Sequence, residues 1–328
     1  MIVTVFSTHA FEKKTLRAAM AEAHELRFRT PGLSIDTATL AAGSEAVCIF
    51  VNDDASAPVL QELKRAGVRF LVLRSAGFNN VDVEVAKALG IRVARVPAYS
   101  PYAVAEHTVA LMLALNRKLV KAHNRVRDGN FSLDGLIGFD MHGKTAGILG
   151  TGKIGQLVAQ ILCGFGCHVL AYDPAPDAAW AERHGVTYVS QEALLAQSDL
   201  LSLHAPLTPQ TQYLIRAETL AQMKDGVLIV NTGRGALIHT RDAIAALKTG
   251  KIGYLGLDVY EEERGLFFED HSEEILQDDV IARLMTFPNV LITSHQAFLT
   301  DTALQNIADT TRANLDAFAA GGVCANEL

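Results

Sequence analysis

The sequence predicts an α/β protein with two domains, each built on a doubly wound, mostly parallel sheet. Short apolar runs alternate with helical stretches through nearly the whole chain, a pattern typical of parallel strands covered by helices on both faces. The length of 328 residues suits two domains better than one. With 49% hydrophobic and 20% charged residues, the chain can bury the cores that two domains require.

The first alternating block ends near Tyr99. The strands expected in it are residues 2–6, 46–51, 70–74 and 91–96, and the helices include residues 12–23 and 58–66. One long helix is expected over residues 101–128, with Pro101 in its first turn and Gly129 as a stop. Its early half, VAEHTVALMLAL, is apolar nearly all round, which predicts burial between domains or between subunits.

A Gly-rich loop over residues 131–143 leads into a second, larger alternating block. The strands expected there are residues 145–150, 168–172, 187–189, 200–204, 227–231, 254–259 and 290–294. A last helix over residues 300–320 follows them, and the strand and helix pattern does not decide on which block it packs.

Charge, hydropathy and cysteine content disfavour several classes of protein. The net charge of −7 argues against nucleic acid as a main partner, because phosphate binding needs a basic face. The first residues lack a basic leader and a cleavage site, and no run reaches the roughly 18 apolar residues that span a bilayer. The cysteines lack zinc-ligand spacing, so we expect no metal, reduced thiols and a cytoplasmic protein; they are Cys48, Cys163, Cys167 and Cys324.

Residues 150–155 form the pattern G-x-G-x-x-G between an expected strand and an expected helix. Gly150 would permit the tight turn, Gly152 would let the backbone approach a pyrophosphate, and Gly155 would let helix and strand pack closely. The dipole and free N–H groups at the helix start favour phosphate binding. The motif therefore predicts a dinucleotide-binding Rossmann domain.

Asp173 ends the next expected strand, where the dinucleotide fingerprint has an acidic residue. Its carboxylate would accept hydrogen bonds from the ribose hydroxyls and repel a 2′-phosphate, which favours NAD over NADP. The alternative is a glycine turn that serves packing alone, with Asp173 capping a strand end.

Candidate catalytic residues follow three of the expected strands, at the edge where parallel sheets bind ligands. Arg234 lies in NTGRG, three acids at residues 261–263 follow a strand, and His295 lies just past another. Arginine matches a carboxylate, and histidine is the commonest general acid or base. Taken singly, each could be structural or surface-exposed, and spacing does not choose among Glu261, Glu262 and Glu263.

Together these residue types suit hydride transfer to a 2-keto acid. The transfer leaves negative charge on the keto oxygen, and a protonated histidine supplies the proton. A nearby carboxylate favours the charged imidazole. An arginine fixes the substrate carboxylate and polarises the carbonyl.

Sequence blocks spread along the chain carry a resemblance to a known family: AVCIFVNDD, LRSAGFNNVD, RVPAYSPYAVAEHT, GILGTGKIG, SLHAPLTP, IVNTGRGALI, GLDVYEEERGLFFED and SHQAFLT. Over essentially its full length, the chain resembles the D-isomer-specific 2-hydroxyacid dehydrogenases, and within them the fermentative D-lactate dehydrogenases. The resemblance implies substrate binding by Arg234, a catalytic acid at Glu263 and a proton donor at His295.

The resemblance also implies further contacts. Backbone N–H groups of Ala76 and Gly77 match a second carboxylate site, Tyr99 lines the substrate pocket, and Phe50 and Phe298 pack the substrate's small side chain. The positions matching NAD contacts are Gly150, Thr151, Gly152, Lys153, Ile154, Gly155, Asp173, Ala205, Pro206, Thr211, Thr232, Gly233 and Asp258. Gly233 departs from the Ser or Ala common in relatives, without an expected loss of activity.

The family architecture implies a smaller, flavodoxin-like substrate domain of residues 1–100 and 297–328, interrupted by a dinucleotide-binding domain of residues 101–296. It also implies homodimers or homotetramers built around the helix after Tyr99. The expected activity is reduction of pyruvate to D-lactate. A bulkier 2-keto acid and a non-catalytic NAD-sensing protein on the same scaffold are the alternatives.

Overall fold

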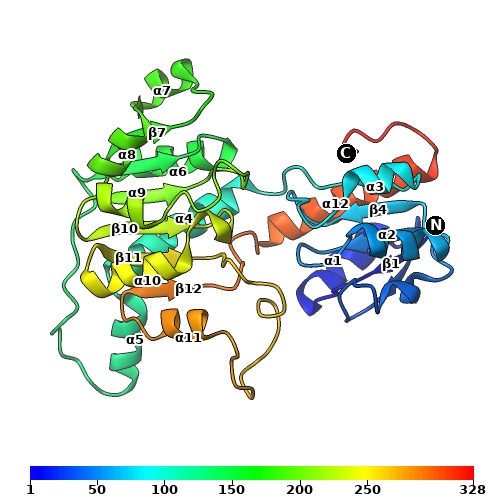
Figure 1. The fold of residues 1–328 in the computed structure, drawn as a ribbon, viewed down its shortest axis with the longest axis horizontal. Coiled ribbons are helices and arrows are strands. Elements are labelled where there is room, and N and C mark those ends of the chain that lie inside the picture. Colours follow the sequence, from blue (N-terminus) through cyan, green and yellow to red (C-terminus); the bar gives the residue numbers. More distant parts are fainter. The chain divides into compact units, whose positions relative to one another are not determined.

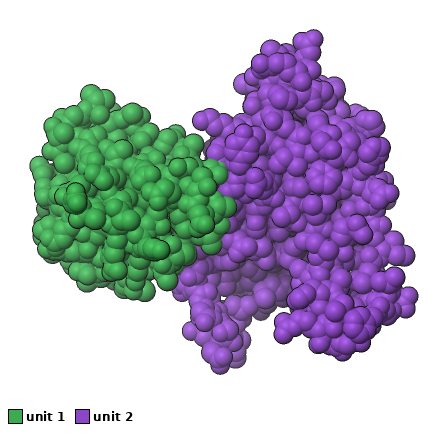
Figure 2. All heavy atoms as spheres, turned by 180° about the vertical axis from the view of Figure 1, so that it is seen from behind, with its two compact units in different colours: residues 1–100, 299–328 green, residues 101–298 purple.

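The computed structural model describes residues 1–328, which divide into two compact units: Met1–Ser100 with Leu299–Leu328, and Pro101–Phe298 (Figure 2). The second boundary therefore lies two residues beyond the expected one. Each unit contains one fully parallel sheet, so the predicted fold class is confirmed (Figure 1). None of the helices is long and apolar enough to span a bilayer.

The five-stranded sheet of the first unit has the order β2-β1-β3-β4-β5, which is the flavodoxin-like doubly wound order. Its strands are β1 (Ile2–Val5), β2 (Glu25–Phe28), β3 (Ala46–Ile49), β4 (Phe70–Leu73) and β5 (Arg92–Ala94). Its helices are α1 (Ala10–Met20), η1 (Ala38–Ala41), α2 (Ala57–Arg65), α3 (Val83–Ala88) and α12 (Asp301–Ala319). The last helix thus belongs to the first unit, where it packs against α1 and β4.

Alternate residues of the first sheet enter two different cores. Val47, Ile49 and Leu71 pack with residues of α2 and α3, whereas Val5 and Val72 pack with residues of α1 and α12. Strand β2 was not predicted. Its sequence, ELRF, lies at the sheet edge with no fully buried residue, so it lacks the buried apolar residues that mark the other strands of this sheet.

The seven-stranded sheet of the second unit has the order β12-β11-β10-β9-β6-β7-β8. Its first strand in the chain, β6, lies inside the sheet, with β7 and β8 on one side and β9 to β12 on the other. This is the doubly wound arrangement of dinucleotide-binding domains. Its strands are β6 (Thr145–Leu149), β7 (His168–Tyr172), β8 (Thr187–Tyr188), β9 (Leu200–Leu203), β10 (Val227–Asn231), β11 (Ile252–Leu257) and β12 (Val290–Ile292). Its helices are α4 (Pro101–Asn116), α5 (Leu119–Arg127), α6 (Lys153–Gly164), α7 (Ala178–His184), α8 (Gln191–Gln197), α9 (Ala217–Gln222), η2 (Gly235–Leu237), α10 (Thr240–Thr249) and α11 (Asp279–Met285).

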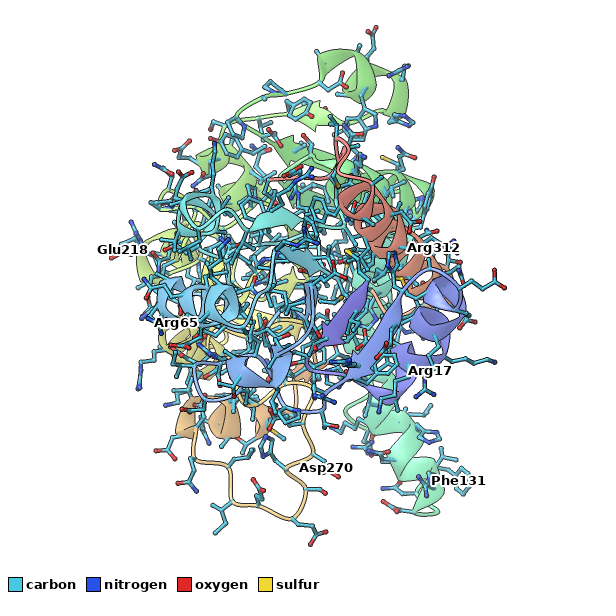
Figure 3. All side chains as sticks on the ribbon, turned by 90° about the vertical axis from the view of Figure 1, so that its right-hand side faces the viewer. Arg17, Arg65, Phe131, Glu218, Asp270 and Arg312 are labelled. Atoms are coloured by element: carbon cyan, nitrogen blue, oxygen red, sulfur yellow. The ribbon has the colours of Figure 1, made fainter.

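The single helix expected over residues 101–128 is wrong, because the chain breaks between α4 and α5. Lys118 takes a left-handed conformation with φ 51°. The buried Asn116 side chain bonds the N–H and C=O of Phe139, at 2.8 and 2.7 Å, so the returning loop holds the end of α4. The apolar α4 is buried against α6, β10 and β11, within its own unit. Helix α5 buries no residue, and Phe131 beyond it lies at an outer end of the unit (Figure 3).

A buried ion pair fixes the carboxyl ends of three strands in the first unit. The guanidinium of Arg74, just after β4, donates from Nε to Glu12 Oε2 at 2.9 Å and from Nη2 to Glu12 Oε1 at 3.1 Å. It also donates to the carbonyl of Phe6, which follows β1, and to that of Cys48, which lies one residue before the end of β3. The two side chains are 0% and 5% exposed. Because every donor has a partner, the buried charge is compensated.

We predict that Arg74→Met lowers the free energy of unfolding by about 3–5 kcal/mol, because it leaves the Glu12 carboxylate buried without its partner. Arg69→Met is the matched control. The Arg69 side chain is 60% exposed and pairs with Glu45. Such surface pairs contribute about 0–1 kcal/mol to the free energy of unfolding. Urea denaturation followed by circular dichroism measures both, and equal losses would contradict the importance of the buried pair.

Candidate functional site

The predicted cofactor and catalytic residues of the second unit follow the carboxyl ends of its strands. The glycine turn follows β6, Asp173 follows β7, Arg234 follows β10, Asp258 follows β11 and His295 follows β12. These strands are parallel, so the segments gather along one edge of one sheet. Open α/β sheets bind their ligands at this edge.

The three glycines of the turn have the different environments that phosphate binding requires. Gly150 has φ 93°, and a Cβ there would lie 2.7 Å from Ala205 N. A Cβ on Gly155 would collide with the carbonyl of Gly150. Gly152 caps the start of α6, and a Cβ there would meet no atom within 4 Å. Two glycines are therefore needed for packing, while Gly152 borders open space at a helix N-terminus, a cradle that fits a pyrophosphate.

Asp173 holds the turn from the neighbouring strand. Its Oδ2 accepts from Thr151 N at 2.7 Å and its Oδ1 from Ala175 N at 2.9 Å. Thr151 Oγ1 also bonds the hydroxyl of Tyr188 at 2.7 Å. The strand-end cap considered from the sequence is thus present, and it places the carboxylate beside the dinucleotide turn, as an NAD site requires. The sequence did not single out Tyr188, which lies in the two-residue strand β8.

Five further expected cofactor positions lie on the loops after β9, which neighbours β6 in the sheet, and after β10, which neighbours β9. Ala205 contacts the glycine turn, and Pro206 O accepts from Thr211 Oγ1 at 2.6 Å. Thr232 is buried and bonds Thr108 of α4 through its hydroxyl at 2.8 Å. Gly233 N donates to Asn231 Oδ1 at 3.0 Å.

His204 lies beside these positions and was not predicted. Its Nε2 contacts Ser202 Oγ at 2.8 Å. Burial lowers the pKa of His204 to about 4. The ring is therefore neutral at physiological pH, which suits a supporting residue better than a proton donor in that range.

His295 and Glu263 form a pair. His295 Nδ1 lies 3.0 Å from Glu263 Oε1, and the side chains are 16% and 19% exposed. Because the carboxylate accepts, Nδ1 carries a proton in this pair and Nε2 is the ring nitrogen left for a substrate. The ring of Phe268 lies beside the imidazole, with centroids 5.9 Å apart.

The three consecutive acids have distinct surroundings. Glu261 accepts from the hydroxyls of Tyr213 and Thr240, both at 2.7 Å. Glu262 is exposed. Glu263 alone of the three contacts His295. The structure therefore distinguishes the acids by geometry, which their spacing could not do.

Asp258 fixes the segment that carries His295. The residue is fully buried. Its Oδ1 accepts from Thr293 Oγ1 at 2.6 Å and Gln296 N at 2.9 Å, its Oδ2 accepts from Ala297 N at 2.9 Å, and its own carbonyl accepts from His295 N at 2.7 Å. We call this set of bonds the Asp258 clamp.

The clamp stays charged at neutral pH. Burial acts to raise the pKa of Asp258, but hydrogen bonds from His107, Thr293 and Ala297 outweigh it, and the pKa lies below its ordinary value. The charged clamp therefore contributes stability at neutral pH, and this contribution is lost as the pH falls through the lowered pKa.

Arg234 lies on the neighbouring loop and is only partly buried. Its Nη1 donates to Gly233 O at 2.7 Å, and its carbonyl accepts from Asn231 Nδ2 at 2.9 Å. The next residue, Gly235, packs closely on Tyr260, and a Cβ on Gly235 would overlap the Tyr260 backbone. The Arg234 loop is thus held against the segment that leads to Glu263.

Four of the expected substrate contacts belong to the first unit, after its strands β3, β4 and β5. Phe50 is buried, and its carbonyl accepts from Asn80 Nδ2 at 3.2 Å. Ala76 O accepts from Arg95 Nη1 at 2.8 Å, and Tyr99 O from Asn306 Nδ2 at 2.6 Å. The N–H groups of Ala76 and Gly77 donate to no backbone carbonyl, as a carboxylate-holding site requires. Phe298, another expected substrate contact, is buried at the end of the second unit.

Comparison with known proteins identifies a family model and a full-length relative. The family model described as D-isomer specific 2-hydroxyacid dehydrogenase, NAD binding domain, matches residues 109–297. D-lactate dehydrogenase of Escherichia coli strain K12 is 54% identical over 329 residues, covering 100% of both chains.

Two solved structures are similar over nearly the whole chain. The pyruvate reductase of Chlamydomonas reinhardtii has a TM-score of 0.94 at 45% identity, covering 99% of this chain and 98% of that one. D-lactate dehydrogenase from Aquifex aeolicus, complexed with NAD and lactic acid, has a TM-score of 0.86 at 33% identity, covering 97% and 96%.

We predict that Gly152→Ala weakens NADH binding by about tenfold or more, equivalent to about 1.4 kcal/mol, without lowering the thermal unfolding temperature. The added methyl would occupy the open space of the phosphate cradle. Gly155→Ala is the matched comparison and should lower stability by about 1–3 kcal/mol, because its methyl collides with Gly150. Fluorescence titration and thermal denaturation separate the two effects. Normal NADH affinity in Gly152→Ala would remove this turn from the cofactor site.

Proposed function

Because this chain belongs to the D-isomer specific 2-hydroxyacid dehydrogenase family, a family of NAD-dependent oxidoreductases, we propose that it reduces pyruvate to D-lactate. The observation that carries the proposal is the His295–Glu263 pair, held by the Asp258 clamp at the sheet edge that also bears the dinucleotide turn. Close relatives named as D-lactate dehydrogenase and pyruvate reductase support the choice of substrate.

His295 acts as the proton donor in this proposal. NADH, when bound, would supply the hydride for the keto carbon, and the keto oxygen would take the proton from His295 Nε2. Glu263, on Nδ1, fixes the ring orientation and stabilises the imidazolium before the proton leaves. In the reverse direction, neutral His295 accepts the hydroxyl proton of D-lactate.

Arg234 binds the substrate carboxylate and polarises the carbonyl in this proposal. A guanidinium matches a carboxylate in charge and geometry, and Arg234 lies on a loop packed against the Glu263 segment. The N–H groups of Ala76 and Gly77, which donate to no backbone carbonyl, are proposed as a second carboxylate contact. Phe50 and Phe298 would contact the methyl group, and their size favours pyruvate over a bulkier 2-keto acid.

The proposed cofactor contacts are the turn at residues 150–155, Asp173, and the loops that bear Ala205, Pro206, Thr211, Thr232 and Gly233. The negative charge of the Asp173 carboxylate favours NAD over NADP, since it would repel a 2′-phosphate. Asp258 is proposed as a further cofactor contact, and its clamp holds the segment that carries His295.

We further propose that the chain works as a homodimer or homotetramer. Support comes from apolar side chains exposed around α5, which include Val120 at 52%, Phe131 at 74%, Leu133 at 80% and Ile137 at 82%. Several large apolar side chains exposed within one segment are typical of an interface. The four free cysteines favour a reducing compartment, the cytoplasm.

A panel of 2-keto acids tests the substrate. We expect the purified protein to oxidise NADH fastest with pyruvate and to yield D-lactate, measured by NADH absorbance and chiral analysis of the product. Faster turnover of phenylpyruvate or a branched 2-keto acid would keep the reaction and change the substrate. NADH binding without turnover of any member would contradict the enzymatic function and favour an NAD-sensing protein.

Two substitutions test the roles of the catalytic side chains. His295→Ala should lower kcat by on the order of 10²–10⁴-fold while NADH affinity is kept, because only proton donation is removed. Arg234→Gln should raise the KM for the keto acid by about 10- to 100-fold, since a charged hydrogen bond to the carboxylate is lost. Steady-state kinetics with NADH titrations measure both. Near-normal kcat in the first variant, or an unchanged KM in the second, rejects the respective role.

A further inference from the structure

His107 reaches the Asp258 clamp from a different element, the buried helix α4. Its Nε2 lies 3.1 Å from Thr293 Oγ1 and 3.5 Å from Asp258 Oδ1. The side chain is 20% exposed, whereas the Asp258 side chain is 1% exposed. No part of the proton-transfer step proposed above uses this histidine.

The hydrogen-bond chemistry fixes which nitrogen of His107 carries a proton. Thr293 Oγ1 lies 2.6 Å from a carboxylate oxygen that can only accept, so its hydroxyl hydrogen points to Asp258. The second contact of Thr293 Oγ1 must therefore be an acceptance from His107. His107 Nε2 carries a hydrogen and donates toward Thr293, and the arrangement runs from imidazole to hydroxyl to carboxylate.

The clamp at the end of this arrangement holds His295 in an uncommon conformation. His295 has φ 49°, in the left-handed region that L side chains rarely adopt. Its own N–H and the N–H groups of the next two residues all donate to Asp258. Strained residues of this kind persist where the surroundings over-determine them. A donor that fixes Thr293 and Asp258 therefore also fixes the imidazole of His295.

We propose that His107 is a positioning residue for the proton donor. It orients Thr293 and the Asp258 carboxylate, and through them the left-handed turn that presents His295 to the keto oxygen. The inference rests on the proposed function for its catalytic readout, whereas its structural readout, the conformation of His295, is independent of the substrate.

His107→Leu removes the donor and keeps an apolar side chain on α4. We expect kcat to fall by about 10- to 100-fold, as small displacements of a catalytic group do, with an unchanged KM for the keto acid. His107→Gln keeps an N–H donor near the position of Nε2 and should recover most of the lost kcat. His168→Leu is the matched control, because His168 is exposed at the amino end of β7, the edge opposite the site.

A crystal structure of His107→Leu supplies the second readout. We expect His295 to leave its left-handed conformation or to lose its contact with Glu263. Thermal unfolding of each variant checks that the fold is intact. An unaltered His295 together with normal kcat overturns the positioning role, as does equal loss of kcat in the Leu and Gln variants. Failure of the wild-type protein to reduce any 2-keto acid contradicts the proposed function instead, and the conformation of His295 still decides the positioning role.

Discussion

The geometry of the candidate site depends on one buried carboxylate, that of Asp258. A charge inside a protein is costly unless donors surround it, and here Thr293, Gln296 and Ala297 supply them while His295 N bonds the Asp258 carbonyl. The need to satisfy Asp258 therefore determines the path of residues 293–297. That path places His295 in a left-handed conformation with Nδ1 on Glu263. The orientation of His295, the proposed proton donor, is thus set by hydrogen bonds from the backbone N–H groups of its segment to Asp258, just after β11.

The parallel sheet explains why the proposed cofactor turn and His295, the proposed proton donor, lie at the same edge of the sheet. All seven strands of the second unit run in the same direction, so every loop that follows a strand emerges at the same edge. The turn at Gly150, the Arg234 loop and the His295 segment follow different strands but occupy this common edge. Close backbone packing at Gly155 and Gly235 fixes these loops further, because neither position has room for a side chain.

Much of the fold was predictable because most of the buried parallel strands are continuous apolar runs; the edge strands β2 and β8 lack that signal. The break at Lys118 could not be predicted, because it depends on a hydrogen bond between Asn116 and Phe139, which lies 23 positions further along the chain. In the site, the motifs identified the turn and the candidate types of residue. They could not separate Glu263 from Glu261, which differ only in which distant side chains they meet. His107 gave no signal of its own, because its link to Thr293 spans 186 positions.

The most direct test of this account is a crystal structure of the protein with NADH and oxamate, an unreactive analogue of pyruvate. In this complex we expect His295 Nε2 to donate to the oxygen that stands for the keto oxygen. We also expect Nδ1 to stay on Glu263, with His295 in its left-handed conformation and the Asp258 clamp intact. A complex in which another side chain contacts that oxygen, or in which His295 leaves the clamp, would contradict this expectation.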